Sequence, residues 1–223
     1  MKKKENGRKA ELVFILDRSG SMSGLESDTV GGYNSMMEKQ RESGMDITVT
    51  TVLFDDRYEL LHDRVKLDEL KPMTNEEYFV RGSTALIDAI GKTFKKIERA
   101  QEHTAAAHKA DKVIFVITTD GYENASHEFR AEDVKRMVEK KRTSNGWEFI
   151  FLGANIDAVE TAKHYGFAGS RAAKFAADSH GIAINNRAIG DAVACMMSCD
   201  DALSDKEMEE HLAPIREYHD STQ

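Results

Sequence analysis

Two aspartates and three hydroxyl residues in this sequence have the types and spacing of ligands for a hard divalent cation. Carboxylate and hydroxyl oxygens are the donors that Mg²⁺ takes up in proteins, and Mn²⁺ is the alternative at such a site. One aspartate and two serines alternate with single residues in one short stretch, and the threonine and second aspartate follow much later in the chain. The set is Asp17, Ser19, Ser21, Thr84 and Asp120.

The chain around these residues predicts that they meet at one edge of a sheet. Five apolar residues, 12–16, stop at Asp17, and a second apolar run over 112–119 stops at Asp120. Short apolar runs that end at a turn are typical of strands buried on both faces. Thr84 directly precedes a helical pattern. Open parallel sheets bind ligands outside the carboxyl ends of their strands, so both aspartates are expected at that edge.

In type and order, the five residues resemble the metal-ion-dependent adhesion site (MIDAS) of von Willebrand factor A (VWA) domains, here of a stand-alone bacterial kind. The order of strands and helices extends the resemblance over roughly residues 10–200. The resemblance implies that the hydroxyls bind Mg²⁺ directly. It implies that Asp17 and Asp120 hold water ligands or switch between direct and water-bridged contact. It also implies that an Asp or Glu of a partner protein fills the open coordination position.

Alternation of strands with helices predicts an α/β fold with a doubly wound, mostly parallel six-stranded sheet and helices on both faces. A β-branched run over 46–54, the break Asp55-Asp56 and an extended pattern over 57–62 predict a hairpin with one antiparallel edge strand. We interpret Asp55-Asp56 as turn chemistry in preference to a second cation site. The predicted domain organisation is a basic flexible N-terminus over 1–9, a VWA domain over 10–200, and an acidic tail or packing helix over 201–223.

Composition restricts the class of protein. The chain has 223 residues, 40% hydrophobic and 31% charged, and a net charge of −8, which is typical of a globular protein and disfavours general nucleic-acid binding. We see no apolar segment of membrane-spanning length and no signal-peptide core, so we expect no membrane association and a cytoplasmic location. Cys195 and Cys199 are expected to be reduced thiols on one helix face.

Two functions of different classes fit these residues. The first is an intracellular protein-binding module, without enzymatic activity, that engages an acidic residue of a partner through Mg²⁺. The alternative is a metal-dependent hydrolase acting on a phosphoester, with His127 as the candidate base, although the sequence has no Gly-rich phosphate cradle. Asp88 is either an acceptor that braces the metal loops or a surface or capping carboxylate. Neither the partner nor the oligomeric state follows from the sequence.

Overall fold

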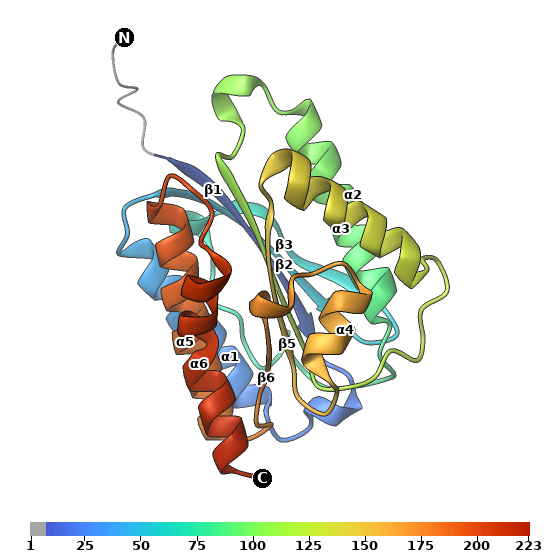
Figure 1. The fold of residues 1–223 in the computed structure, drawn as a ribbon. Coiled ribbons are helices and arrows are strands. Elements are labelled where there is room, and N and C mark those ends of the chain that lie inside the picture. The colour runs from blue at the N-terminus through green and yellow to red at the C-terminus, as the bar shows by residue number, and fades with distance from the viewer. Residues whose placement is uncertain (1–7) are drawn as a thin grey trace.

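The computed structural model describes residues 8–223 and contains one six-stranded sheet (Figure 1). The strands lie in the order β3-β2-β1-β4-β5-β6, and all neighbours pair in parallel except β2 and β3. The predicted fold class is therefore confirmed, including the antiparallel edge strand. The strands are β1 Lys9–Asp17, β2 Asp46–Phe54, β3 Tyr58–Lys66, β4 Lys112–Thr119, β5 Glu148–Gly153 and β6 Ala172–Lys174.

Helices cover both faces of the sheet (Figure 1). They are α1 Glu26–Arg41, α2 Leu86–His103, α3 Ala131–Asn145, α4 Ala158–His164, α5 Ser179–Ser198 and α6 Asp205–Ser221. The central strand β1 shows how the two layers share one sheet. Leu12 and Phe14 pack in a core with residues of α1, α5 and α6, whereas Val13 and Ile15 pack with residues of α2, α3 and α4. Alternate side chains of a strand point to opposite faces, so an uninterrupted apolar run is what this position requires.

The N-terminal boundary differs from the predicted one. Residues 1–7 of the expected flexible segment lie outside the described residues. Lys9, however, already belongs to β1, and its backbone amide donates to Asp111 at 2.9 Å. The guanidinium of Arg8 donates to the carbonyl of Ser198 at 2.6 Å. The strand extends beyond the apolar run because its backbone pairs with β2 from Lys9 onward, and side-chain hydrophobicity does not report that pairing.

At the C-terminus the chain forms the long helix α6, which packs against α5 and β6. Its buried side chains are Met208, Leu212, Ile215 and His219. Three of them join the same apolar core as α1 and α5. Of the two forms expected for residues 201–223, the structure thus has the packing helix, which is long and continues through Pro214. Acidic and polar residues dominate the outer face of α6 and conceal its length in the sequence.

Replacing Ser204 tests whether α6 unfolds together with the rest of the domain. Ser204 and Glu207 form a reciprocal capping box at the start of α6. We expect Ser204→Ala to lower the free energy of unfolding by about 1 kcal/mol, measured by urea denaturation followed by circular dichroism. Lys206→Ala, at a well-exposed neighbouring position, should change it by less than about 0.5 kcal/mol. Equal effects of the two substitutions would show that α6 is not coupled to the cooperative unit.

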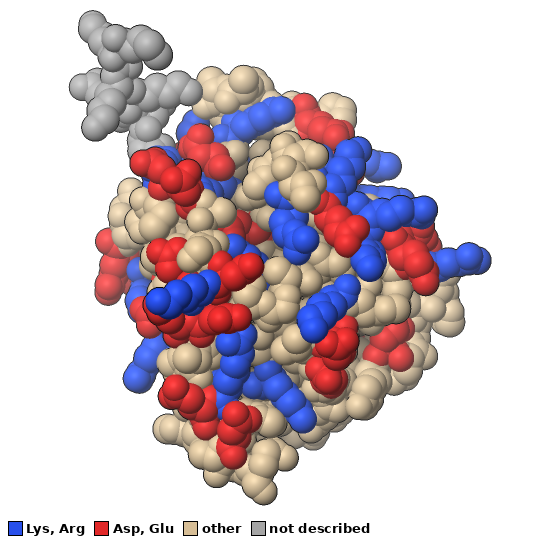
Figure 2. All heavy atoms as spheres, viewed as in Figure 1, with Lys and Arg blue, Asp and Glu red and all other residues tan. Residues whose placement is uncertain are grey.

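The surface carries both signs of charge. On the face drawn in Figure 2, lysine and arginine side chains are interspersed with aspartate and glutamate, and no continuous basic stripe runs across the described part of that face. Within residues 8–223 no helix combines the length and apolar character needed to cross a membrane.

Candidate functional site

The carboxyl ends of β1 and β4 place Asp17 beside Asp120. The two strands are parallel neighbours with Leu16 opposite Thr118, so Asp17 lies next to Thr119. The hydroxyl of Thr119 donates to Asp17 Oδ2 at 2.6 Å, and the backbone amide of Ser19 donates to Asp17 Oδ1 at 2.7 Å. Both oxygens of Asp17 are therefore held by short hydrogen bonds, and this carboxylate is almost fully buried.

The remaining predicted residues converge on the same place. Ser19 Oγ and Ser21 Oγ are 3.2 Å apart, and the Ser21 hydroxyl donates to Asp120 Oδ1. A Cβ atom built on Gly121 would lie 3.2 Å from both Ser21 Oγ and Thr84 Oγ1, so the threonine hydroxyl faces the same small volume. Any larger residue at position 121 would crowd these two hydroxyls. The structure thus brings all five predicted residues together from three separate loops.

The donor set of this cluster lacks positive charge. Burial raises the pKa of Asp17 to about 6, with a smaller contribution from the negative charge of Asp120. Burial also raises the pKa of Asp120, and Asp120 Oδ2 is a buried oxygen without a hydrogen-bond partner among the described residues. A divalent cation would compensate both carboxylates and would use the unpartnered oxygen. The residues present therefore fit a small hard cation.

The side chains around Asp17 and Asp120 restrict the kind of cation site that these residues could form. The described residues contain no group of three or more His, Cys, Asp or Glu side chains placed to hold a metal ion. Any cation at Asp17 and Asp120 would depend on the three hydroxyls for its remaining protein ligands. Ser21 is exposed, whereas Ser19 and Thr84 are buried, so the cluster faces solvent on the Ser21 side.

The loop that carries Asp120 is fixed to the first turn of α2. Asp88 accepts hydrogen bonds from the backbone amides of residues 127, 128 and 129, each at 2.9 Å. Glu123 accepts from the amide of Ile87 at 2.9 Å, and Asn124 Oδ1 accepts from the amide of Thr84 at 2.9 Å. Asp88 is buried, so it is the bracing acceptor of the two expected alternatives and not a surface carboxylate. These contacts join the Asp120 loop and Thr84 into one unit.

A buried ionic cluster beside the site was not predicted. Arg18, directly after Asp17, is fully buried, and its Nε donates to Asp55 Oδ2 at 3.1 Å. Arg81 Nε donates to the same oxygen at 2.6 Å, and Arg18 also pairs with Glu59. The cluster ties the Asp17 loop to the end of β2 and to the segment before Thr84. Arg18 and Arg81 lie 37 and 26 residues from Asp55 in the chain, so no local sequence pattern reports their pairing.

Turn chemistry explains only part of Asp55. Its Oδ1 accepts from the backbone amide of Arg57 at 2.7 Å, which is the expected turn contact. Its other oxygen belongs to the ion pairs described above, and the whole residue is buried. Burial raises the pKa of Asp55, but hydrogen bonds from Arg81 and Arg57 and the charge of Arg18 outweigh burial and lower it overall. Asp55 is therefore a structural anion next to the candidate site.

Other polar residues, including His127 and the two cysteines, lie at the rim of this edge or elsewhere. Asp157 caps α4 by accepting from the amide of Glu160 at 3.0 Å, and Asn155 is exposed beside it. Within residues 8–223, the hydrogen bond of His127 runs from its backbone amide to Asp88, and none joins its imidazole to the five clustered residues. Cys195 and Cys199 are both free and partly exposed, with sulfurs 3.8 Å apart at the end of α5.

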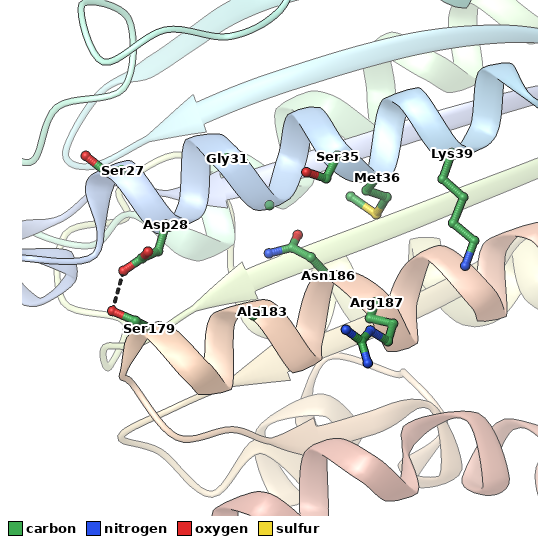
Figure 3. Close-up of a pocket in the computed structure, with 11 residues that line it drawn as sticks. Ser27, Asp28, Gly31, Ser35, Met36, Lys39, Ser179, Ala183, Asn186 and Arg187 are labelled. Carbon is green, nitrogen blue, oxygen red and sulfur yellow. Dashed lines mark hydrogen bonds between the residues drawn. The ribbon is translucent and has the colours of Figure 1, made fainter.

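A groove of about 490 Å³ lies away from this cluster, between α1 and α5 (Figure 3). Small residues such as Gly31 and Ala183 are among those that line it, and Asp28 joins the two helices by accepting from the hydroxyl of Ser179 at 2.6 Å. None of the five predicted residues lines the groove. An ion needs a few converging oxygens and not a large cavity, so we place the candidate site at the sheet edge.

Comparison with known proteins gives structural matches alone, since no protein-family model and no curated sequence matches the chain. The PilB minor pilin of Streptococcus sanguinis superposes with a TM-score of 0.61 at 11% identity, over 86% of this chain and 63% of that one. The pilus adhesin SpaC of Lactobacillus rhamnosus GG superposes with a TM-score of 0.63 at 10% identity, over 85% of this chain and 31% of the adhesin.

A third match names the fold directly. The von Willebrand factor type A protein of Catenulispora acidiphila superposes with a TM-score of 0.55 at 12% identity, over 84% of this chain and 43% of that one. This chain spans less than two thirds of the length of each of these three structures. The sheet order, the one antiparallel edge strand and the two helical layers agree with that comparison. The chain therefore has a VWA-like α/β fold.

Proposed function

We propose that this chain is a metal-dependent protein-binding module. Its Mg²⁺, or Mn²⁺, would be held at a MIDAS made of Asp17, Ser19, Ser21, Thr84 and Asp120. The observation that carries the proposal is the buried Asp120 Oδ2, which has no partner among the described residues and lies within a cluster of three hydroxyls and two carboxylates. That donor set matches the chemistry of a hard cation and lacks the positive charge that the cation would bring.

Each residue would have a distinct role toward the cation. The hydroxyls of Ser19, Ser21 and Thr84 are neutral donors that supply oxygen without cancelling charge. Asp17 already accepts from Thr119 and Ser19, so it suits the role of holding a metal-bound water through its remaining lone pairs. When bound, the cation would supply a Lewis-acidic position toward solvent. A cation held mainly by neutral oxygens attracts an external carboxylate, so a partner's Asp or Glu is the expected ligand.

Calorimetric titration with MgCl₂ tests the metal site. We expect the wild-type chain to bind one Mg²⁺, and Asp120→Ala to bind it more than about tenfold more weakly, because the substitution removes one of two carboxylates. Asp63→Ala is the matched control, since Asp63 is a carboxylate of β3 that pairs with Lys96 at the surface. Unchanged affinity in Asp120→Ala would contradict the site.

The alternative function, a metal-dependent phosphoester hydrolase, is tested by a separate activity assay. Phosphatase activity against p-nitrophenyl phosphate that requires Mg²⁺ and disappears in Asp17→Ala would contradict a pure binding module. The binding module predicts no such turnover and predicts that EDTA releases the partner.

A further inference from the structure

Two exposed aromatic side chains lie at the same sheet edge as the candidate cation site. Among the described residues, Phe79 and Tyr122 are the large hydrophobic side chains that stay exposed, at 42% and 69%. Every other large apolar side chain of this part of the chain is buried or partly covered. Exposed aromatic rings that are placed together on a surface mark interaction sites, because their burial by a partner is strongly favourable.

Phe79 is exposed and yet held in place. The guanidinium carbons of Arg18 and Arg81 lie 5.1 and 5.2 Å from the centre of its ring. Arg18 is itself immobilised by Asp55, and the preceding Tyr78 is buried with its hydroxyl donating to the carbonyl of Asp17. A ring fixed before binding loses little conformational entropy when a partner covers it.

Tyr122 lies on the other side of the cation site. It follows Asp120 and Gly121 directly, so it is next to the residue whose Cβ position faces Ser21 and Thr84. The loop beyond it is fixed by Glu123 and Asn124 to the start of α2. Phe79 contacts the cluster at the end of β2, whereas Tyr122 follows β4, and β1 with Asp17 lies between these two strands. The two rings therefore flank the cation site along the sheet edge.

We propose that Phe79 and Tyr122 are the anchor residues of the docking surface, and that the partner is a polypeptide segment with a carboxylate flanked by apolar side chains. This inference rests on the proposed function for the carboxylate and adds the apolar part of the partner's chemistry. The carboxylate would reach the cation while apolar neighbours on either side cover the two rings. A few buried aromatic anchors carry most of the affinity in protein interfaces.

The experiment first selects peptide ligands and then replaces the two aromatic residues. A random heptapeptide phage library is panned on the Mg²⁺-loaded chain, and a selected peptide is synthesised and titrated by fluorescence anisotropy. We expect the selected peptides to share an Asp or Glu with an aromatic or aliphatic residue within two positions. Phe79→Ser and Tyr122→Ser should each weaken binding of the peptide about tenfold, or about 1.4 kcal/mol, with the affinity for Mg²⁺ unchanged.

Two conservative variants that retain an aromatic ring at positions 79 and 122 serve as controls. Phe79→Tyr and Tyr122→Phe should bind the peptide within about twofold of the wild type, because the apolar contact is retained. Mg²⁺-dependent binding that both serine variants retain would overturn the aromatic anchors and leave the proposed function standing. Binding that persists in EDTA would overturn the proposed function, and the acidic part of this inference with it. A selection that enriches no peptide would contradict a linear segment as the partner.

Discussion

Asp55→Ala is expected to lower the free energy of unfolding by about 3–5 kcal/mol. The substitution removes the carboxylate that receives both Arg18 Nε and Arg81 Nε, so the fully buried Arg18 keeps the half-exposed Glu59 as its remaining ion-pair partner. A buried charge whose partner is removed keeps its desolvation penalty and loses the compensating attraction. Urea denaturation followed by circular dichroism measures the effect. The affinity for Mg²⁺ should also fall, because Arg18 directly follows Asp17.

Two further substitutions distinguish the contribution of the buried ion pairs to stability from that of the turn. Asp56→Ala changes the adjacent, exposed aspartate and should alter stability by about 0.5 kcal/mol or less. The double substitution Arg18→Met with Asp55→Leu removes both charges and should recover most of the loss, since apolar residues of similar size replace buried ion pairs well. The buried-cluster interpretation is wrong if Asp55→Ala and Asp56→Ala destabilise the chain equally.

Asp17→Asn is expected to act in opposite directions on stability and on metal binding. In EDTA at pH 8 it should stabilise the chain by up to about 3 kcal/mol, because folding raises the pKa of Asp17 from 3.8 to about 6. With Mg²⁺ at a hundredfold excess over Kd, the wild-type chain should gain about 2.7 kcal/mol and the variant much less. Thermal unfolding with and without Mg²⁺ measures both effects.

The sign of the pH dependence follows from the raised pKa. Below pH 3.8 Asp17 is protonated in both the folded and unfolded chains and contributes no penalty. The penalty of ionising the buried carboxyl grows as the pH rises and is complete above about pH 6. Asp17→Asn should therefore gain stability over the wild type between about pH 4 and pH 6 and keep that gain at higher pH.

The Asp17→Asn variant can keep the hydrogen bonds of the wild-type aspartate, so its stability can be compared directly with that of the wild type. The asparagine carbonyl can still accept from the amide of Ser19, and its NH₂ group can donate to Thr119 Oγ1, whose own proton can turn to the carbonyl of Gly121 at 3.3 Å. Ser23→Ala, at an exposed position of the same loop, is the control. A variant that loses stability at pH 8 in EDTA would contradict the raised pKa.

The sequence predicted the elements whose signal is local. The apolar run 12–16, the β-branched run 46–54 and the helical pattern after Thr84 are each visible in side-chain type, and the structure forms a strand or helix at each. The convergence of the five clustered residues also followed from local signals, because Asp17 and Asp120 lie at the ends of strands, the two serines lie in the turn after Asp17, and Thr84 lies just before a helix. Topological rules for parallel sheets then placed those ends together.

Features that depend on contacts between distant segments were not predictable. Arg18 looks like an ordinary loop residue, and its burial depends on Asp55 and Arg81 from two other loops. Asp88 had two alternatives in the sequence because the backbone amides that donate to it, in residues 127–129, lie 39–41 positions away. The length of α6 was hidden for a different reason, since only one narrow side of that helix is apolar. Sequence periodicity reports a buried face poorly when the face is narrow.

The two outer strands of the sheet are both protected against pairing with another chain. At one border, Arg216 of α6 donates to the carbonyl of Ala172 in β6 at 2.8 Å and to that of Ser170, just before the strand, at 3.3 Å. At the other border, the register of β3 shifts near Arg64, which has a φ of 51°, and charged side chains follow one another along the strand. Irregular, charged or covered borders disfavour edge-to-edge aggregation. The C-terminal helix thus covers part of the β6 border in addition to packing in the core, through a hydrogen-bonding role that its amphipathic pattern does not reveal.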